Sequence, residues 1–455
     1  MLNFRLLLCL LFSINCFAIE DIYKKLVELS IKTSPDVIQK RENFIAAQER
    51  DSTSGSSFYP KVDLKLAQEH YNERNITPYS IYDEDGKNDL SSYEFTLSMP
   101  LFKKSLFSRK SETKSLELLS KEEYELYVLN YNWIVKDALS RYLIETYFTY
   151  RLDDFIEQSR DLIKKERTSL RLGNSIRADL DQTEVNLLNL LNQKDEVDHR
   201  QLMAKQYLML LTGLKEDDTT FSQILSYVKT KDDFEKAIGY LSKFDVSVND
   251  INDFLEKNTR KLKETSPFLK QVQHNYDAQV AKVKQDLDRE YPELELRGSL
   301  YKEKGNWGDV FDESGNSKKI GVYLNIPLFS GFSTFSKKDA QDSDILAAEV
   351  LKRREERRFY FNIRENRLLI DNLEIKVKRL KEIVEKQRRI LNTFYKSYKL
   401  GKVTMVDLIQ KQNELLMLEK VYAESRIRLS TSLESLGNTI GVYVLEEGKK
   451  KKALN

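Results

Sequence analysis

The sequence predicts a mainly helical protein with a smaller β part, in which long helical hairpins and pairs of strands occur twice along the chain. Gly and Pro are scarce, at 15 and 7 of 455 residues, so long stretches contain no helix breaker. Four segments alternate strictly between apolar and polar residues, as half-buried strands do. Proline-containing motifs recur in the same order in both halves, which indicates an internal two-fold repeat.

The segment 1–18 has the layout of a secretory signal. One positive charge, Arg5, precedes an apolar run and a few small or neutral residues, so we expect cleavage before Ile19. Both cysteines, Cys9 and Cys16, lie in this segment, and an alternative is that Cys16 becomes a lipidated N-terminus. No later apolar stretch reaches the ~20 residues that a membrane-spanning helix needs. We therefore expect an exported mature chain without disulfides or a transmembrane helix.

Composition argues against several classes of function. Lys and Arg number 74 against 72 Asp and Glu, and this balance disfavours a nucleic-acid-binding protein. His70, His199 and His274 are scattered without the spacing of a metal site or a catalytic triad. No glycine-rich phosphate loop occurs. We predict no enzyme activity, no cofactor and no metal site.

The repeat rests on motifs that recur about 230 residues apart. The matched pairs are Thr33-Ser34-Pro35 with Thr265-Ser266-Pro267, Pro60 with Pro292, Pro100-Leu101-Phe102 with Pro327-Leu328-Phe329, Leu172-Gly173 with Leu400-Gly401, and Gly213 with Gly441. We therefore expect a first repeat over 19–213, a linker over 214–249 that sits at the joint of the helices, and a second repeat over 250–441. A basic tail, 442–455, follows, either as a solvated end or in contact with an anionic surface.

Each repeat predicts a short helix, 36–53 or 268–290, followed by a β-hairpin that a proline opens. In each strand the apolar residues share one face and the polar residues the other. The apolar positions are Val62, Leu64 and Leu66; Tyr93, Phe95, Leu97 and Met99; Leu294 and Leu296; and Ile320, Val322, Leu324 and Ile326.

A long helix is predicted after each hairpin, because neither Gly nor Pro interrupts 103–172 or 334–400. Each would be ~100 Å long. A helix of about 40 residues then returns, so we expect the short helix and the return helix to stack end to end and together cover the long one. Apolar residues in steps of three and four predict a coiled-coil seam at Ile370, Leu373, Val377, Leu380, Val384, Gln387, Leu391, Phe394 and Tyr398.

Strands of about ten residues are long enough to cross a bilayer when tilted. Four strands cannot close a barrel, and open strand edges are not tolerated in hydrocarbon, so a membrane β-barrel would need several chains. The alternative is a soluble sheet on a periplasmic coiled-coil scaffold or adaptor protein.

The order of these motifs resembles the TolC-type outer-membrane efflux proteins over nearly all of 20–441. The most specific part is Ile326-Pro327-Leu328-Phe329-Ser330-Gly331, which is similar to that family's strand-to-helix junction, as is Pro100. The resemblance implies a homotrimer in which four strands per protomer form one membrane β-barrel and the helical hairpins form a tunnel in the periplasm. It also implies an exit duct for tripartite efflux or type I secretion, with a periplasmic adaptor and an inner-membrane transporter as partners.

The resemblance also implies roles for the hairpin tips. Leu172 and Gly173, and Leu400 and Gly401, match the family's adaptor-docking turns, although the residues that follow, Asn174 and Lys402, are polar where the family has apolar ones. Docking is therefore expected to be more polar than in the family, and the alternative is that these glycines only end their helices.

Four further positions match the family's closed periplasmic mouth. Asp407 corresponds to an aperture carboxylate, whereas the second acidic position is Gln410 here, so the ring would carry half the charge. Asp179 and Tyr398 correspond to a tie that holds the mouth closed. The partners of the family's other tie are absent, because Val403 and Ala178 stand there. The alternative for Asp179 and Asp407 is an acid near a helix N-terminus, stabilised by the helix dipole.

Overall fold

The computed structural model describes residues 19–71, 88–172, 176–243, 262–305, 316–329, 331–400 and 402–441. The predicted signal segment 1–18, the tip glycines Gly173 and Gly401, and the basic tail 442–455 lie outside these ranges. Within them, no helix combines the length and the apolar character needed to cross a membrane.

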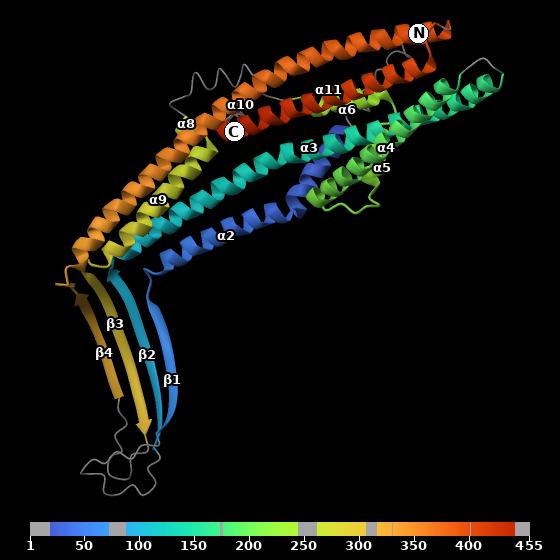
Figure 1. The fold of residues 1–455 in the computed structure, drawn as a ribbon. Helices are drawn as coiled ribbons and strands as arrows, with labels where there is room; N and C mark the ends of the chain where they lie inside the picture. The colour runs from blue at the N-terminus through green and yellow to red at the C-terminus, as the bar shows by residue number, and fades with distance from the viewer. Residues whose placement is uncertain are drawn as a thin grey trace, which may run out of the picture. The chain divides into compact units, whose positions relative to one another are not determined.

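The predicted elements occur twice in the same order (Figure 1). The first set is α2 (Pro35–Ser56), β1 (Lys61–Tyr71), β2 (Asn88–Phe102), α3 (Lys104–Arg171) and α4 (Arg177–Thr212). The second set is α9 (Pro267–Asp288), β3 (Glu293–Gly305), β4 (Asn316–Asn325), α10 (Ser333–Lys399) and α11 (Met405–Ile440). The matched helices have nearly equal lengths: 22 residues each for α2 and α9, 68 and 67 for α3 and α10, and 36 each for α4 and α11.

Some helices were not predicted. Residues 19–33 are helical ahead of Pro35. The linker contains α5 (Thr219–Ser226) and α6 (Lys231–Leu241), and α8 (Leu262–Thr265) precedes α9. Asp218 and Thr230 cap α5 and α6 by accepting backbone N–H hydrogen bonds, which is the usual role of these residue types at a helix start.

The chain divides into two compact units whose boundaries cut across the repeats. One, which we call the helical unit, contains the described residues of 1–42, 122–270 and 357–455. The other, which we call the sheet unit, contains those of 43–121 and 271–356.

In the sheet unit the four strands form one antiparallel sheet in the order β1-β2-β3-β4 (Figure 1). Directly opposed residues of antiparallel strands share a face. Leu64 lies opposite Phe95, which in turn lies opposite Leu300, so the apolar positions of neighbouring strands fall on the same face. The helix ends of this unit are joined by Asp51 of α2, which binds Lys110 and Thr113 of α3 at 2.7 and 2.9 Å.

The helical unit buries its apolar residues between helices. One cluster joins the helix over 19–33, α3, α4, α5, α6 and α11, and a second joins α8, α9, α10 and α11. The predicted seam of α10 is confirmed, because Ile370, Leu373, Leu380 and Val384 are buried and its remaining positions are half-buried.

Both return helices end against the kink at the start of the short helix of their own repeat. Gly213 ends α4 with φ 68°, and Thr33 Oγ1 donates to the carbonyl of Thr212 at 2.8 Å. Gly441 ends α11 with φ 85°, and Ser266 Oγ donates to the carbonyl of Thr439 at 2.7 Å. This confirms the predicted end-to-end stacking.

Candidate functional site

The first candidate surface is the apolar face of the sheet, which the described residues leave uncovered. Leu66 and Leu64 of β1 are 72% and 63% exposed, and Ile320 of β4 is 78% exposed. Exposed apolar residues on this scale mark an interaction surface. The members that are more than a third exposed are Val62, Leu64, Leu66, Tyr93, Phe95, Leu300, Ile320, Val322 and Leu324.

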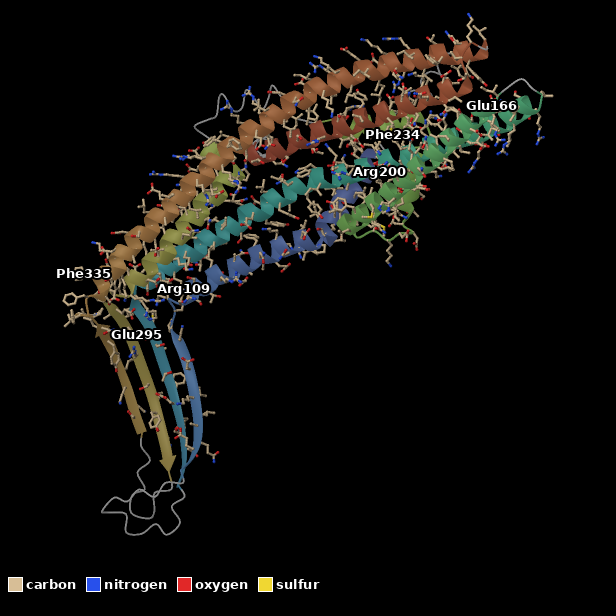
Figure 2. All side chains as sticks on the ribbon, viewed as in Figure 1. Arg109, Glu166, Arg200, Phe234, Glu295 and Phe335 are labelled. Carbon is tan, nitrogen blue, oxygen red and sulfur yellow. The ribbon has the colours of Figure 1, made fainter. Side chains whose placement is uncertain are left out.

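The opposite face of the sheet is polar. Asp63, Thr96, Ser299 and Lys319 lie opposite one another across the four strands. Glu295 of β3, labelled in Figure 2, pairs with Arg297 on the same strand at 2.7 Å. The sheet thus has one apolar and one polar face, the alternation that is typical of strands in the wall of a membrane β-barrel.

The strand-to-helix junctions are built differently in the two repeats. Pro100 lies inside β2 opposite Glu295, and the pairing shifts between Pro100 and Phe102, just before α3 begins. Pro327 instead follows the end of β4, and Gly331 and Phe332 both adopt positive φ, 64° and 66°. This left-handed pair turns the chain into α10.

Large apolar side chains gather on the second junction. Leu328 and Phe329 are 91% and 74% exposed, and the rings of Phe329 and Phe332 meet edge to face at 5.3 Å. Phe335, labelled in Figure 2, is also exposed near the start of α10. Together these side chains form an exposed apolar patch after the end of β4.

The predicted tips lie where the long helices end. α3 ends at Arg171 and α10 at Lys399, and the next residues, Leu172 and Leu400, are 70% and 71% exposed. Both leucines are therefore accessible to a partner.

Asp407 has a defined local role at the start of α11. Its backbone N–H donates to Thr404 Oγ1 at 3.1 Å, and its carboxylate accepts from the Thr404 backbone at 3.0 Å, which is a capping box. The side chain remains exposed. Asp407 thus lies near a helix N-terminus, as the helix-dipole interpretation predicted. Its side chain is also accessible, as a carboxylate at the periplasmic aperture would have to be.

The remaining mouth residues are not brought together by any contact that the structure describes. Tyr398 is half-buried near the end of α10, and Gln410 donates to Glu414 within α11 at 3.5 Å. Asp179 lies in the first turn of α4, but its side chain is outside the described part. The tie between Asp179 and Tyr398 stays a prediction.

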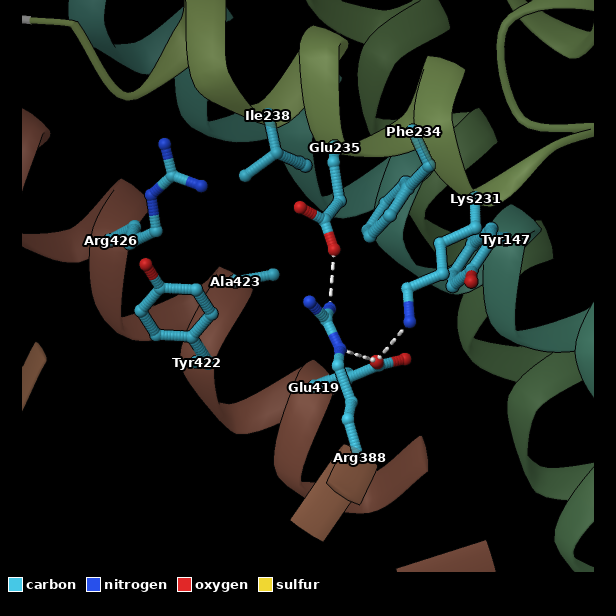
Figure 3. Close-up of a pocket in the computed structure, with 10 residues that line it drawn as sticks. All are labelled: Tyr147, Lys231, Phe234, Glu235, Ile238, Arg388, Glu419, Tyr422, Ala423 and Arg426. Atoms are coloured by element: carbon cyan, nitrogen blue, oxygen red, sulfur yellow. Dashed lines mark hydrogen bonds and ion pairs between the residues drawn. The ribbon is translucent and has the colours of Figure 1, made fainter. Parts of the chain in front are cut away.

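Sequence reasoning missed a joint where α3, α6, α10 and α11 meet (Figure 3). Glu419 of α11 accepts from Lys231 of α6 at 2.8 Å and from Arg388 of α10 at 2.9 Å, and Arg388 also binds Glu235 of α6. Burial opposes the charge of Arg388, but the two carboxylates outweigh it and raise its pKa. The cavity between these side chains is only ≈ 20 Å³, so the joint is packed closed.

The same joint buries Tyr147 of α3. Its ring stacks on Phe234 of α6 with centroids 4.0 Å apart and an interplanar angle of 4°. Burial, with the nearby charge of Glu419, raises the pKa of Tyr147 to about 12. Tyr147, Phe234 and Glu419 are far apart in the sequence, so no local motif predicts that they meet.

Two buried ion pairs join α3 to α11. Lys136 of α3 binds Glu434 of α11, and Glu145 of α3 accepts from Lys420 of α11 at 2.7 Å. Arg200 of α4, labelled in Figure 2, approaches Glu145 at 3.4 Å. These pairs link the first helical hairpin to the second.

Two apolar helix faces in the helical unit are left exposed by the residues that the structure describes. On α4 the exposed residues include Val185, Leu188, Leu202, Met203 and Leu210. On α10 they are Phe361, Leu368, Ile375, Ile383 and Ile390. The described residues contain no group of three His, Cys, Asp or Glu side chains that could hold a metal ion.

The chain resembles known proteins in part of its sequence and in its fold. Residues 259–442 match the sequence model of the family described as "Outer membrane efflux protein". No curated protein matches the chain in sequence. Among solved structures, the Campylobacter jejuni CmeC outer membrane channel aligns with a TM-score of 0.72 at 16% identity, over 92% of this chain and 85% of that one.

Two further structures agree. The Vibrio cholerae outer membrane protein VceC aligns with a TM-score of 0.68 at 13% identity, over 92% of this chain and 96% of that one. The open state of the Neisseria gonorrhoeae MtrE outer membrane channel gives 0.66 at 12% identity, over 92% and 88%. Residues 259–442 therefore match the outer membrane efflux protein family in sequence, and the chain has the same fold as these outer membrane channels.

Proposed function

We propose that this protein is the outer-membrane exit duct of an efflux system, with its strands in the membrane and its helices in the periplasm. The observation that carries the proposal is the uncovered apolar face of a four-stranded sheet whose other face is polar. Its strands have 10 to 15 residues, which is enough to cross a bilayer when tilted. The apolar face would meet lipid and the polar face a wet lumen.

Further copies of the chain would close the wall. β1 and β4 form the two edges of the sheet, and an edge strand in hydrocarbon needs a partner for its backbone groups. A second copy supplies one by pairing its β1 with β4 of the first. Three copies, the number typical of the family, would form a barrel with four strands from each protomer.

The internal repeat indicates how copies meet in the helical unit. α4 begins at Arg177 and α11 at Met405, and the ends of α3 and α10 are related by the same offset. Tyr147, Phe155 and Leu162 of α3 are buried in the cluster that includes α6 and α11. Their equivalents on α10, Ile375, Ile383 and Ile390, are exposed. We assign this face of α10 to α4 of the next copy, whose apolar face is also exposed.

The tips and the mouth complete the proposal. Leu172 with Gly173 and Leu400 with Gly401 would seat a periplasmic adaptor that links the duct to an inner-membrane transporter, in tripartite efflux or type I secretion. Asp407 from each copy would line the periplasmic opening with carboxylates and favour cations. Gln410 contributes no charge to that ring.

The tie between Asp179 and Tyr398 gives a gating test. A phenol donating to a carboxylate is a strong, charge-assisted hydrogen bond. Asp179→Ala or Tyr398→Phe should therefore weaken the closed state and raise single-channel conductance. Unchanged conductance in both variants would remove this tie from the mechanism.

Planar-bilayer recording of the mature chain tests the function itself. Stable insertion with a small, steady, cation-preferring conductance supports a duct that is shut at its far end. The competing function is a soluble periplasmic scaffold or adaptor. Failure to insert, together with a monodisperse species in detergent-free buffer, would establish that alternative.

A further inference from the structure

We infer that the two buried ion pairs between α3 and α11 specify which helix α3 accepts on this face and in which register. Both basic and acidic partners are well buried: the side chains of Lys136 and Glu434 are 9% and 14% exposed, and those of Glu145 and Lys420 are 11% and 13% exposed. Breaking such a pair leaves a buried charge uncompensated. The pairs thus disfavour any other helix neighbour or register on this face of α3, because such an arrangement would leave a buried charge unpaired.

The polarity of the pairs opposes sliding. α3 carries a base and then an acid, Lys136 and Glu145, and α11 likewise carries a base and then an acid, Lys420 and Glu434. Because the helices run antiparallel, each charge meets its opposite in one register. A slide that moved Lys420 toward Lys136 would bury like charges together.

The internal repeat supplies the contrast. The offset between α4 and α11 places Gln206 and Asn192 of α4 where α11 has Glu434 and Lys420. α4 therefore offers α3 of another copy no charge at either position. It offers apolar side chains instead, such as Leu210 where α11 has Asn438. Glu145 also accepts from Arg200 of its own α4, but an α4 placed where α11 lies would leave Lys136 without an acid and Glu145 without Lys420. This difference keeps first and second hairpins alternating in an assembly.

A third contact lies on the same line and makes the register measurable. Asn438 Nδ2 of α11 donates to Asn130 Oδ1 of α3 at 3.2 Å and to the carbonyl of Leu129 at 3.1 Å. The chain's two cysteines, Cys9 and Cys16, both precede Ile19. Cysteines introduced at Asn130 and Asn438 into a chain that begins at Ile19 are then the only pair that can form a disulfide.

The experiment measures the disulfide yield of the Asn130→Cys, Asn438→Cys chain by oxidation and non-reducing electrophoresis. We expect near-complete closure in this background. Adding Lys136→Glu or Glu434→Lys should lower the rate of closure by roughly tenfold, since each places like charges in a buried site. Adding both exchanges restores an opposite-charge pair, so closure should recover.

A matched control is Lys164→Glu, on an α3 side chain that is 77% exposed, and it should leave closure unchanged. Full closure in both single variants, or no recovery in the double variant, would overturn the inference. The inference about assembly rests on the proposed duct, but this assay reads the register within one chain and needs no membrane insertion. If the chain fails to insert into a bilayer but follows this pattern of closure, the proposed duct is wrong and the inference about the register of α3 and α11 still holds.

Discussion

The two return helices, α4 and α11, are repeats of one another in opposite surroundings. Each has 36 residues and ends in a glycine of positive φ. Along α11 most apolar residues are buried, among them Leu408, Leu416 and Leu433. Along α4 large apolar side chains are exposed toward both ends, among them Val185, Leu188, Leu202 and Leu210, with polar residues between them.

The difference is clearest at equivalent positions. Val185, Leu202 and Leu210 of α4 correspond to Asn413, Ser430 and Asn438 of α11, so the helix with the exposed face is the more apolar one there. Asn438 and Ser430 bind groups of the same chain. The comparison teaches that the two copies have diverged to suit different neighbours. At these positions α11 makes polar contacts within the chain, whereas α4 presents apolar side chains that the proposed assembly would cover with another copy.

The largest expected effect comes from breaking the exposed face of α4. Leu202→Glu places a charge on a residue that is 47% exposed in the single chain, so the chain should fold. The charge would be buried between copies, where it has no partner, and we expect the oligomer to be lost in light scattering of detergent extracts. Lys164→Glu, on an α3 side chain that is 77% exposed, should leave the oligomer intact. An unchanged mass for Leu202→Glu would contradict the assignment of this face.

The second test compares the glycines that end the two helices. A Cβ at Gly441 would lie 2.3 Å from the carbonyl oxygen of Thr265, whereas at Gly213 it would lie 3.0 Å from the Thr33 side chain. Both substitutions incur the cost of a left-handed residue, about 1–2 kcal/mol. Gly441→Ala must also move backbone, so we expect it to lower the free energy of unfolding by more than about 3 kcal/mol. Denaturant titration of both variants decides it, and equal losses would mean that the two joints are packed alike.

The smallest effect concerns equivalent faces of α3 and α10. The face of α3 around Tyr147 is covered by α6, whereas the equivalent face of α10 is exposed in the single chain. The pKa of Tyr147 is raised from 10.0 to about 12, so the folded chain holds this phenol neutral. Its contribution to stability is present below pH 10 and is lost as the pH rises toward 12. A shift of two units corresponds to about 2–3 kcal/mol. Tyr147→Phe should therefore unfold less steeply with pH between 10 and 12 than the wild type.

The equivalent position on α10 supplies the control. Ile375 is 50% exposed in the single chain, so Ile375→Tyr in a Tyr147→Phe chain kept monomeric by Leu202→Glu should add a phenol that titrates near its ordinary pKa in ultraviolet absorbance. If the wild type and Tyr147→Phe lost the same free energy of unfolding between pH 10 and 12, the burial of Tyr147 would have no energetic consequence.

The sequence predicted the repeated elements well because their signals are local. Alternation along a strand-length segment marks a strand, and the scarcity of Gly and Pro marks α3 and α10, so the bounds agree within a few residues outside the loops. The helix over 19–33 was not predicted, because Pro35 has the position of a residue at the start of the first helix. α5 and α6 are too short and too mixed in polarity for a period to show.

The candidate site was predictable only in part. The sheet faces and the position of Asp407 near a helix start follow from spacing in the sequence. The joint of Glu419, Arg388 and Lys231, and the pairs of Lys136 and Glu145 with α11, depend on which long helices become neighbours. Charged residues are so common in these helices that a buried lysine has no distinguishing signature in the sequence.

The matched helix lengths restrict how such a chain can change over evolutionary time. α2 and α9 have 22 residues each, and α4 and α11 have 36 each, and each return helix ends against the kink of a short helix in its own repeat. An insertion in one return helix alone would push its glycine past that kink and leave its tip out of step with the other. Longer or shorter descendants should therefore arise by insertions or deletions in both repeats together, in steps of whole heptads that keep the α10 seam in phase.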